Sequence, residues 1–320
     1  MRYGSLPGIG VPVSRLVLGT NQFTLERLAQ AHDLLDAFVA AGGTTIDTAH
    51  VYANGESEQV LGRWLEKRGG AQNLVIITKG AHPKVDLRKL ETAVWTPRVT
   101  PEAIAEDLAE SLGRLGLSSV DLYLLHRDDE RVPVGPLVRA LDDLVLAGKI
   151  RAFGASNWTH QRVAEANAFA SANGCRPFAI SSPQFSLAVP AQLDLPGILS
   201  ISGNAEAIDY YRRSRVSLLA WSSQGGGLFS DQATPNRIRR YDRPDNWERL
   251  RRARELAAHH GRTPTQVALA WALAQPLDLY AVIGANQPAH LTDSLETLSL
   301  RLTEPELAWL NLQADLLPAS

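Results

Sequence analysis

Eight short apolar runs recur along this chain, and a segment with helical spacing follows each of them. The runs begin roughly 30–45 residues apart, and they lie at 13–18, 45–47, 74–79, 121–126, 152–156, 179–182, 216–220 and 280–283. Such an alternation predicts parallel strands joined by helices. Because a barrel of eight such units is ordinary at 320 residues, we expect one domain spanning residues 1–320.

The two ends of the chain refine this prediction. Residues 2–12 are interrupted by Gly and Pro, which favours a small hairpin over the barrel floor. A Thr-x-Pro start predicts an extra helix at 303–312. A doubly wound sheet usually carries Gly-x-Gly-x-x-Gly after its first strand, whereas Gly8-Ile9-Gly10 comes before it here. The predicted fold is therefore α/β: a (β/α)8 TIM barrel with an N-terminal hairpin and extra C-terminal helices.

Bulk composition excludes several classes of protein. The formal net charge is −2, so no general basic field would attract nucleic acid. Cys175 is the single cysteine, which rules out an internal disulfide and the cysteine patterns of metal sites. No apolar run approaches the ~20 residues that span a membrane, and the N-terminus does not resemble a signal peptide. We expect a cytoplasmic protein without a metal ion, and composition leaves its oligomeric state open.

Three successive predicted strands end in an ionisable residue, namely Asp47, Lys79 and His126, and Tyr52 follows five residues after Asp47. Catalytic groups of such barrels lie at the C-terminal strand ends and in the following loops, so we expect these four to converge. A lone buried ammonium is costly, which makes Asp47 the expected partner of Lys79. The cation should pull the pKa of Tyr52 below about 10. Such a phenol can protonate a carbonyl oxygen that His126 also orients.

Each of these residues also has an ordinary structural explanation. Asp47 and Lys79 could form only a buried ion pair, and His126 or Tyr52 taken alone is more often a core or surface residue. Four proton-handling groups at consecutive strand ends, however, favour catalysis.

The order of motifs along the whole chain resembles the aldo-keto reductase superfamily. The segments that carry the resemblance are Asp47-Thr48-Ala49-x-x-Tyr52-x-x-Gly55-x-Ser57-Glu58-x-x-Leu61-Gly62, Thr78-Lys79, Leu124-Leu125-His126, Gly154-x-Ser156-Asn157 and Gln184-Phe185-Ser186. The resemblance implies a catalytic tetrad of Asp47, Tyr52, Lys79 and His126, with Tyr52 as general acid. It also implies NADP(H) or NAD(H), held across the barrel mouth without a Rossmann fold, and interconversion of an aldehyde or ketone with its alcohol.

Cofactor-binding candidates follow from the strand ends together with the resemblance. Ser156, Asn157 and Gln184 carry the donors and acceptors that a carboxamide needs. Trp221 offers a flat face for the nicotinamide ring, although a core tryptophan that caps the barrel is an open alternative. The Gly-rich loop that follows could bring backbone N–H groups to a pyrophosphate. The expected set is completed by Gly19, Thr20, Ser222, Gln224, Gly226 and Leu228.

The segment after the eighth strand should hold the adenosine end. Its candidates are Ile283, Gly284, Asn286, Gln287, His290, Asp293 and Ser294. Relatives that prefer NADPH commonly place Arg or Lys here, and this chain has none at 284–290. NAD or dual use therefore remains an alternative to the NADP that the resemblance implies.

Substrate choice should depend on the loops at 80–99, 185–203 and 229–245. Phe23, Trp95, Phe229 and Arg127 are candidate pocket residues. Arg127 begins the charged run 127–131, which could border the pocket and favour a polar or sugar-like substrate, or could form a surface turn.

Two other functions remain to be weighed. A non-catalytic nicotinamide-nucleotide-sensing partner subunit is one, because ion-channel β subunits resemble this family, although the intact tetrad argues against it. A barrel hydrolase or isomerase that uses Asp47 with Asp128 or Asp129 is the other, and it leaves Lys79 and Gln184 without a role.

Overall fold

Eight parallel strands close into a barrel in the computed structural model, which describes residues 1–83, 95–193, 195–230 and 234–316. Neighbours around the ring follow the order β10-β3-β4-β5-β6-β7-β8-β9. The strands are β3 (Leu16–Gly19), β4 (Thr45–Asp47), β5 (Val75–Gly80), β6 (Val120–Leu125), β7 (Ile150–Ser156), β8 (Ile180–Ser182), β9 (Ser217–Ala220) and β10 (Leu279–Gly284). The predicted (β/α)8 barrel is confirmed.

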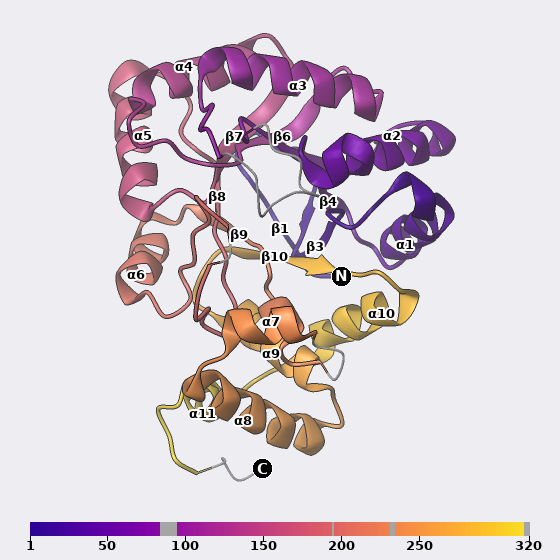
Figure 1. The fold of residues 1–320 in the computed structure, drawn as a ribbon, viewed down its shortest axis with the longest axis vertical. Helices are drawn as coiled ribbons and strands as arrows, with labels where there is room; N and C mark the ends of the chain where they lie inside the picture. Colours follow the sequence, from indigo (N-terminus) through magenta and orange to yellow (C-terminus); the bar gives the residue numbers. More distant parts are fainter. Residues whose placement is uncertain (84–94, 194, 231–233, 317–320) are drawn as a thin grey trace.

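Helices surround the barrel, and Figure 1 shows α1 to α6 following one another around it. The helices are α1 (Leu28–Ala40), α2 (Glu56–Arg68), α3 (Pro101–Leu115), α4 (Val134–Leu146), α5 (His160–Asn173), α6 (Ala205–Ser214), α7 (Pro235–Tyr241), α8 (Pro244–His260), α9 (Pro264–Ala274), α10 (Pro288–Glu296) and α11 (Glu304–Leu310). Short 3-10 turns are η1 (Leu25–Arg27), η2 (Tyr52–Gly55), η4 (Gly225–Gly227) and η5 (Thr297–Ser299). No helix in the described ranges is long and apolar enough to cross a membrane.

Threonine caps and prolines fix several helix starts. The Thr100 side chain accepts a hydrogen bond from the Ala103 backbone N–H at the start of α3. At α11, Thr303 and Glu306 form a capping box, in which each side chain bonds the other residue's backbone N–H. The predicted helix start at Thr303 is confirmed.

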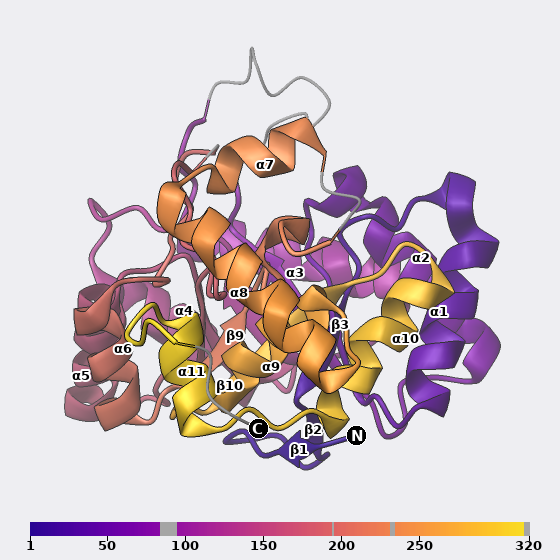
Figure 2. The ribbon, with the colours of Figure 1, turned by 90° about the horizontal axis from the view of Figure 1, so that it is seen from below.

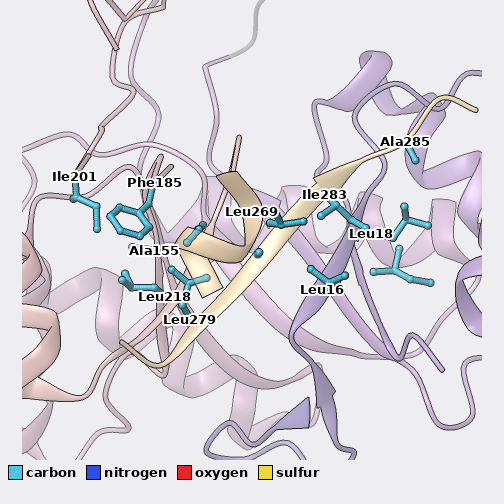
Figure 3. Close-up of a cluster of buried hydrophobic side chains, with 14 of the residues drawn as sticks. Leu16, Leu18, Ala155, Phe185, Ile201, Leu218, Leu269, Leu279, Ile283 and Ala285 are labelled. Carbon is cyan, nitrogen blue, oxygen red and sulfur yellow. The ribbon is translucent and has the colours of Figure 1, made fainter. Parts of the chain in front are cut away.

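Alternate strand residues build two separate apolar layers. On β5, Val75 and Ile77 belong to the cluster inside the barrel, whereas Ile76 belongs to the layer between barrel and helices. This follows from the period of two along a strand. Leu18 and Ile283, register partners on β3 and β10, lie side by side in the outer layer (Figure 3).

The N-terminal hairpin closes the floor of the barrel. Its strands are β1 (Tyr3–Gly4) and β2 (Val13–Ser14), and Leu6, Ile9 and Val13 join the interior cluster. Figure 2 shows the hairpin and α7 at opposite ends of the molecule. The prediction that 13–18 forms one barrel strand is wrong, because Val13 and Ser14 pair with the hairpin and the barrel strand begins at Leu16.

The prediction that 229–245 is a loop is wrong. This segment contains α7 and the start of α8. A seven-residue helix is too short to be stable by itself, so its contacts decide its conformation. Tyr241 at the end of α7 is fully buried, and its backbone carbonyl accepts a hydrogen bond of 2.8 Å from the Asn246 side chain.

Candidate active site

The strand period explains why three of the predicted residues meet at the barrel mouth. Lys79 lies two residues beyond Ile77, and His126 two residues beyond Leu124, so both continue the inward-facing rows. Asp47 ends β4 next to Ile46, which faces the helix layer, and therefore also faces inward. All three side chains are buried. The strand ends thus bring a carboxylate, an ammonium and an imidazole to one place.

Lys79 joins this group to Tyr52. Its Nζ lies 2.6 Å from Asp47 Oδ1 and donates to the Tyr52 hydroxyl at 3.1 Å. It also donates to the Thr48 carbonyl at 2.9 Å. The expected pairing of Lys79 with Asp47 and the expected proximity of Tyr52 are therefore present.

The loop after β4 continues alongside β5 in the same direction and carries Tyr52 to Lys79. The backbone N–H of His50 donates to the Lys79 carbonyl at 2.9 Å. The chain then passes through left-handed residues, with φ of 47° at Ala53 and 54° at Asn54. Gly55 has φ 92°, and a Cβ there would approach Arg114 Cζ to 2.8 Å, so this position requires glycine.

A row of rings flanks the Tyr52 phenol. The His126 ring makes an edge contact with the Tyr52 ring, with the two ring centroids 5.6 Å apart. The centroid of the His82 ring lies 5.0 Å from that of His126. His82 in turn makes an edge contact with Trp95 at 5.6 Å. The sequence interpretation missed His82, because it lies in a segment treated only as a long loop and belongs to no recognised motif. Residues 84–94 of the predicted substrate loop 80–99 lie outside the described residues.

Burial changes the acid–base behaviour expected of this cluster. Desolvation raises the pKa of the Tyr52 phenol above 10.0, although the Lys79 charge opposes it. The expectation of a lowered Tyr52 pKa is therefore wrong, because the loss of water outweighs the nearby cation. Burial, with the Arg127 charge adding to it, lowers the pKa of His126 well below 6.5. At neutral pH the cluster thus contains a protonated phenol and a neutral imidazole.

We expect His82 to make the free energy of unfolding depend on pH in the acidic range. Burial lowers its pKa from 6.5 to about 4, so over this interval the unfolded chain binds a proton that the folded chain does not. The stability from this group is present above pH 6.5 and is lost as the pH falls toward 4. The loss should be on the order of 3 kcal/mol.

Denaturant unfolding at several pH values measures this effect. In His82→Gln the free energy of unfolding should fall less steeply at acidic pH than in the wild type. His259→Gln, which removes an exposed histidine of α8, is the control and should keep the wild-type decline. An unchanged decline in His82→Gln would mean that this ring is not the group that costs stability.

The three predicted carboxamide-binding residues lie together at the ends of β7 and β8, but their polar atoms are engaged within the protein. Asn157 donates to the His126 carbonyl at 3.2 Å and to Ser156 Oγ at 3.0 Å. Ser156 Oγ donates to the Ser182 carbonyl at 2.9 Å. Gln184 is fully buried; it donates to Ser186 Oγ at 2.9 Å and its oxygen accepts from a neighbouring serine at 3.1 Å. Direct contact with a ligand would require some of these bonds to exchange.

The segment after β9 fits a nucleotide better. Within the described chain, Trp221 Nε1 is buried without a hydrogen-bond partner. Ser222 has φ 50°, and the three glycines of η4 all have positive φ. A Cβ on Gly226 would approach Tyr241 Cε2 to 2.7 Å, which keeps this turn free of side chains. The backbone N–H groups of Gly225, Gly227 and Leu228 donate to carbonyls within the turn, so an anion would have to replace these bonds or bind the other N–H groups of the turn.

The other predicted cofactor residues flank this turn. Gln224 Nε2 donates to Ser294 Oγ at 2.9 Å, which joins the loop to α10. Gly19 pairs with Gly284 across β3 and β10, and Thr20 Oγ1 donates to the Asp47 carbonyl at 3.1 Å. Ile283 and Leu228 direct their side chains into the outer apolar layer, so only their backbone could contact a ligand. Gln287 is exposed and His290 is half-buried.

The adenosine end contains two further observations. Asn286 Oδ1 is buried and has no partner among the residues that the structure places. Asp293 accepts from Thr263 Oγ1 at 2.8 Å and is therefore already engaged. Arg27 of η1 lines the same small depression as Asn286 and Phe23. The sequence interpretation missed this cation, which lies after β3, far along the chain from the segment that follows β10.

The predicted pocket residues lie in three different places. Phe23 is buried beside Asn286 rather than beside Tyr52. Trp95 and Arg127 lie near the ring cluster, since Trp95 contacts His82 and Arg127 directly follows His126. Phe229 is buried in the outer apolar layer. The two aspartates of the hydrolase alternative are paired elsewhere, Asp128 with Arg162 at 3.3 Å and Asp129 with Arg131 at 2.8 Å.

Comparison with known proteins decides the family. A sequence model of the Aldo/keto reductase family matches residues 15–311. The chain belongs to the aldo/keto reductase family. Aldo-keto reductase str7 of Strobilurus tenacellus is 30% identical over 290 residues, which cover 86% of this chain and 78% of that protein. Aryl-alcohol dehydrogenase GME11368 of Pestalotiopsis microspora is 29% identical over 282 residues, covering 87% and 70%.

A solved structure shows the same fold. A thermostable aldo-keto reductase, Tm1743, in complex with the inhibitor epalrestat matches with a TM-score of 0.75 and 24% identity. The match covers 98% of this chain and 100% of that chain. As a member of the aldo/keto reductase family, the protein is an oxidoreductase.

Proposed function

We propose that this aldo/keto reductase interconverts an aldehyde or ketone with its alcohol, using NADP(H) or NAD(H). The observation that carries the proposal is the continuous contact from Asp47 through Lys79 to the Tyr52 hydroxyl, beside the His126 ring. This group lies at the C-terminal mouth of the barrel, where such folds place their chemistry.

Each of the four residues has a distinct part in the proposed reaction. Tyr52 is protonated at neutral pH and gives its proton to the carbonyl oxygen during reduction. Burial by itself would lower the pKa of Lys79, but Asp47 and Tyr52 raise it, so the ammonium persists beside the phenol. Its charge stabilises the phenolate that forms when the proton leaves. Neutral His126 is suited to hydrogen-bond the same oxygen and so orient the substrate.

The nicotinamide would supply the hydride when bound. Trp221 would offer its face to the ring, and the turn at 222–228 would offer backbone N–H groups to the pyrophosphate. Asn286 and Arg27 would lie toward the adenosine, where Arg27 supplies the positive charge that a 2′-phosphate requires. This supports NADP(H), which the missing Arg or Lys at 284–290 had placed in question.

Mixing the protein with NADPH or NADH and a panel of aldehydes, aromatic ones first, tests the proposal. Aromatic aldehydes come first because a relative is named an aryl-alcohol dehydrogenase. We expect loss of the reduced-nicotinamide absorbance with equimolar alcohol formation, and a lower KM for NADPH than for NADH. Tight nucleotide binding without turnover of any carbonyl would favour the nucleotide-sensing partner subunit instead. Absence of nucleotide binding would refute both.

A further inference from the structure

Arg127 is a buried cation that the proposed reaction does not use. The residue is 8% exposed. Within the described part of the chain its guanidinium makes one hydrogen bond, from Nη1 to the His126 carbonyl at 2.9 Å, and its Nε has no partner. A buried charge is normally paired, because removing it from water is costly. The arrangement therefore leaves N–H donors of the Arg127 guanidinium available to a ligand.

Among the residues that the structure describes, the carboxylates near Arg127 are paired with other cations and do not neutralise it. Asp128 pairs with Arg162 at 3.3 Å, and Asp129 pairs with Arg131 at 2.8 Å. Asp47 is held by Lys79 at 2.6 Å, so those two charges offset each other. His126 and His82 have pKa values lowered by burial and stay neutral at neutral pH. Burial lowers the pKa of Arg127 only to about 10, so it alone leaves a net positive charge here.

The position of Arg127 places that charge on the substrate side. Its charge acts on both the Tyr52 phenol and the His126 imidazole. Its Cδ packs against Gly197, where an added Cβ would approach to 3.2 Å, and its carbonyl accepts from Trp158 Nε1 at 3.1 Å. The contact with Gly197, in the loop after β8, holds the stem of the side chain, and the bond from Trp158, after β7, holds the Arg127 backbone.

The phosphates of a nucleotide are the other possible anion, and the topology argues against them. The expected phosphate turn follows β9, and Arg127 follows β6. In the ring order β6-β7-β8-β9 the two are three strands apart. An anion next to Tyr52 and His126 therefore comes from the molecule whose carbonyl these residues hold.

We propose that Arg127 binds a carboxylate of the substrate, so that the preferred substrates are aldehydes or ketones that carry a negative charge. The planar guanidinium matches a carboxylate with two parallel hydrogen bonds. Binding would also supply a counter-charge, which the described residues do not provide. This inference rests on the proposed carbonyl reduction and specifies its substrate class.

Matched substrate pairs test it. The ortho, meta and para carboxybenzaldehydes are each compared with their methyl esters, and succinic semialdehyde is compared with butanal. We expect a higher kcat/KM for at least one acid than for its neutral counterpart.

Arg127→Met should reduce that acid-to-neutral ratio of kcat/KM by roughly 10- to 100-fold, the range of a charge-assisted hydrogen bond. Arg127→Lys should retain an intermediate ratio. Arg131→Met removes an arginine whose side chain is 78% exposed and should keep the wild-type ratio.

Other results would overturn the inference. Equal use of acids and neutral partners by the wild type, or an unchanged ratio in Arg127→Met, would do so. Arg127→Met could instead lower kcat/KM equally for the acid and for its neutral partner, and also shift the alkaline pH at which the reductive rate falls. That result would show that Arg127 acts only through Tyr52. If no carbonyl is reduced at all, the proposed function fails rather than this inference.

A binding measurement covers the case in which Arg127→Met does not fold. Benzoate, but not benzamide, should raise the Tm of the wild type and should inhibit ester reduction competitively. Arg127→Lys should show a smaller rise in Tm with benzoate. Equal effects of benzoate and benzamide on the wild type would contradict a carboxylate site.

Discussion

Replacing Tyr52 with phenylalanine should lower kcat by roughly 10²- to 10⁴-fold, the range that general acid–base catalysis contributes. The variant loses only the hydroxyl that Lys79 Nζ contacts at 3.1 Å, while the ring keeps its edge contact with His126. Nucleotide affinity should stay close to that of the wild type, because the proposed nucleotide contacts come from other strands. Steady-state rates and nucleotide titration of the same preparation measure both quantities.

The pH profile adds an independent check on the same hydroxyl. Carbonyl reduction needs the protonated phenol, and burial raises its pKa above 10.0. The reductive rate should therefore stay level through neutral pH and fall only when the pH passes this raised value. Alcohol oxidation needs the ionised phenol and should rise over the same alkaline range.

A second tyrosine provides the control. Tyr211→Phe removes a buried hydroxyl on α6 that lies 2.8 Å from Ser181 Oγ, away from the strand-end cluster. It should keep turnover, and Tyr52→Phe should lose it. Turnover of Tyr52→Phe within a few-fold of the wild type would refute the assignment of Tyr52 as the acid.

The predictable part of this molecule is the part that strand periodicity controls. Inward and outward positions alternate on every barrel strand, so an ionisable residue two positions beyond an inward apolar residue must reach the mouth. Lys79 after Ile77 and His126 after Leu124 follow this rule. The barrel and the meeting of these groups could thus be expected from local pattern alone.

What the sequence could not provide depends on tertiary contacts. Val13 looks like part of an apolar strand, but its place in the hairpin comes from pairing with Gly4. Helix α7 ends at Tyr241, and the buried site that receives this side chain exists only in the folded chain. The sign of the Tyr52 pKa shift depends on how completely the phenol is dehydrated. That Arg127 has no carboxylate partner among the described residues appears only when the two aspartates that follow it are seen with other partners.

The loop that carries Tyr52 depends on a second buried ion pair, between Glu58 and Arg114. Glu58 is fully buried at the start of α2; its Oε1 accepts from Thr78 Oγ1 at 2.6 Å and its Oε2 lies 3.2 Å from Arg114 Nη1. The same Nη1 donates to the His50 carbonyl at 3.0 Å. One guanidinium therefore holds both the helix start and the loop that leads to Tyr52.

Arg114→Met should lower the free energy of unfolding by about 3–5 kcal/mol, the cost of leaving a buried charge without its partner. It should also reduce kcat, because the His50 carbonyl loses the donor that holds the loop.

Glu58→Gln combined with Arg114→Met removes both charges, so the double variant should be more stable than the sum of the single losses predicts. Arg139→Met, at an exposed arginine that bonds Asn173, should change stability little. Denaturant unfolding of Arg114→Met, Glu58→Gln, the double variant and Arg139→Met, together with the wild type, completes the cycle. An Arg114→Met protein as stable as the wild type, or strictly additive losses in the double variant, would mean that Glu58 does not depend on this partner.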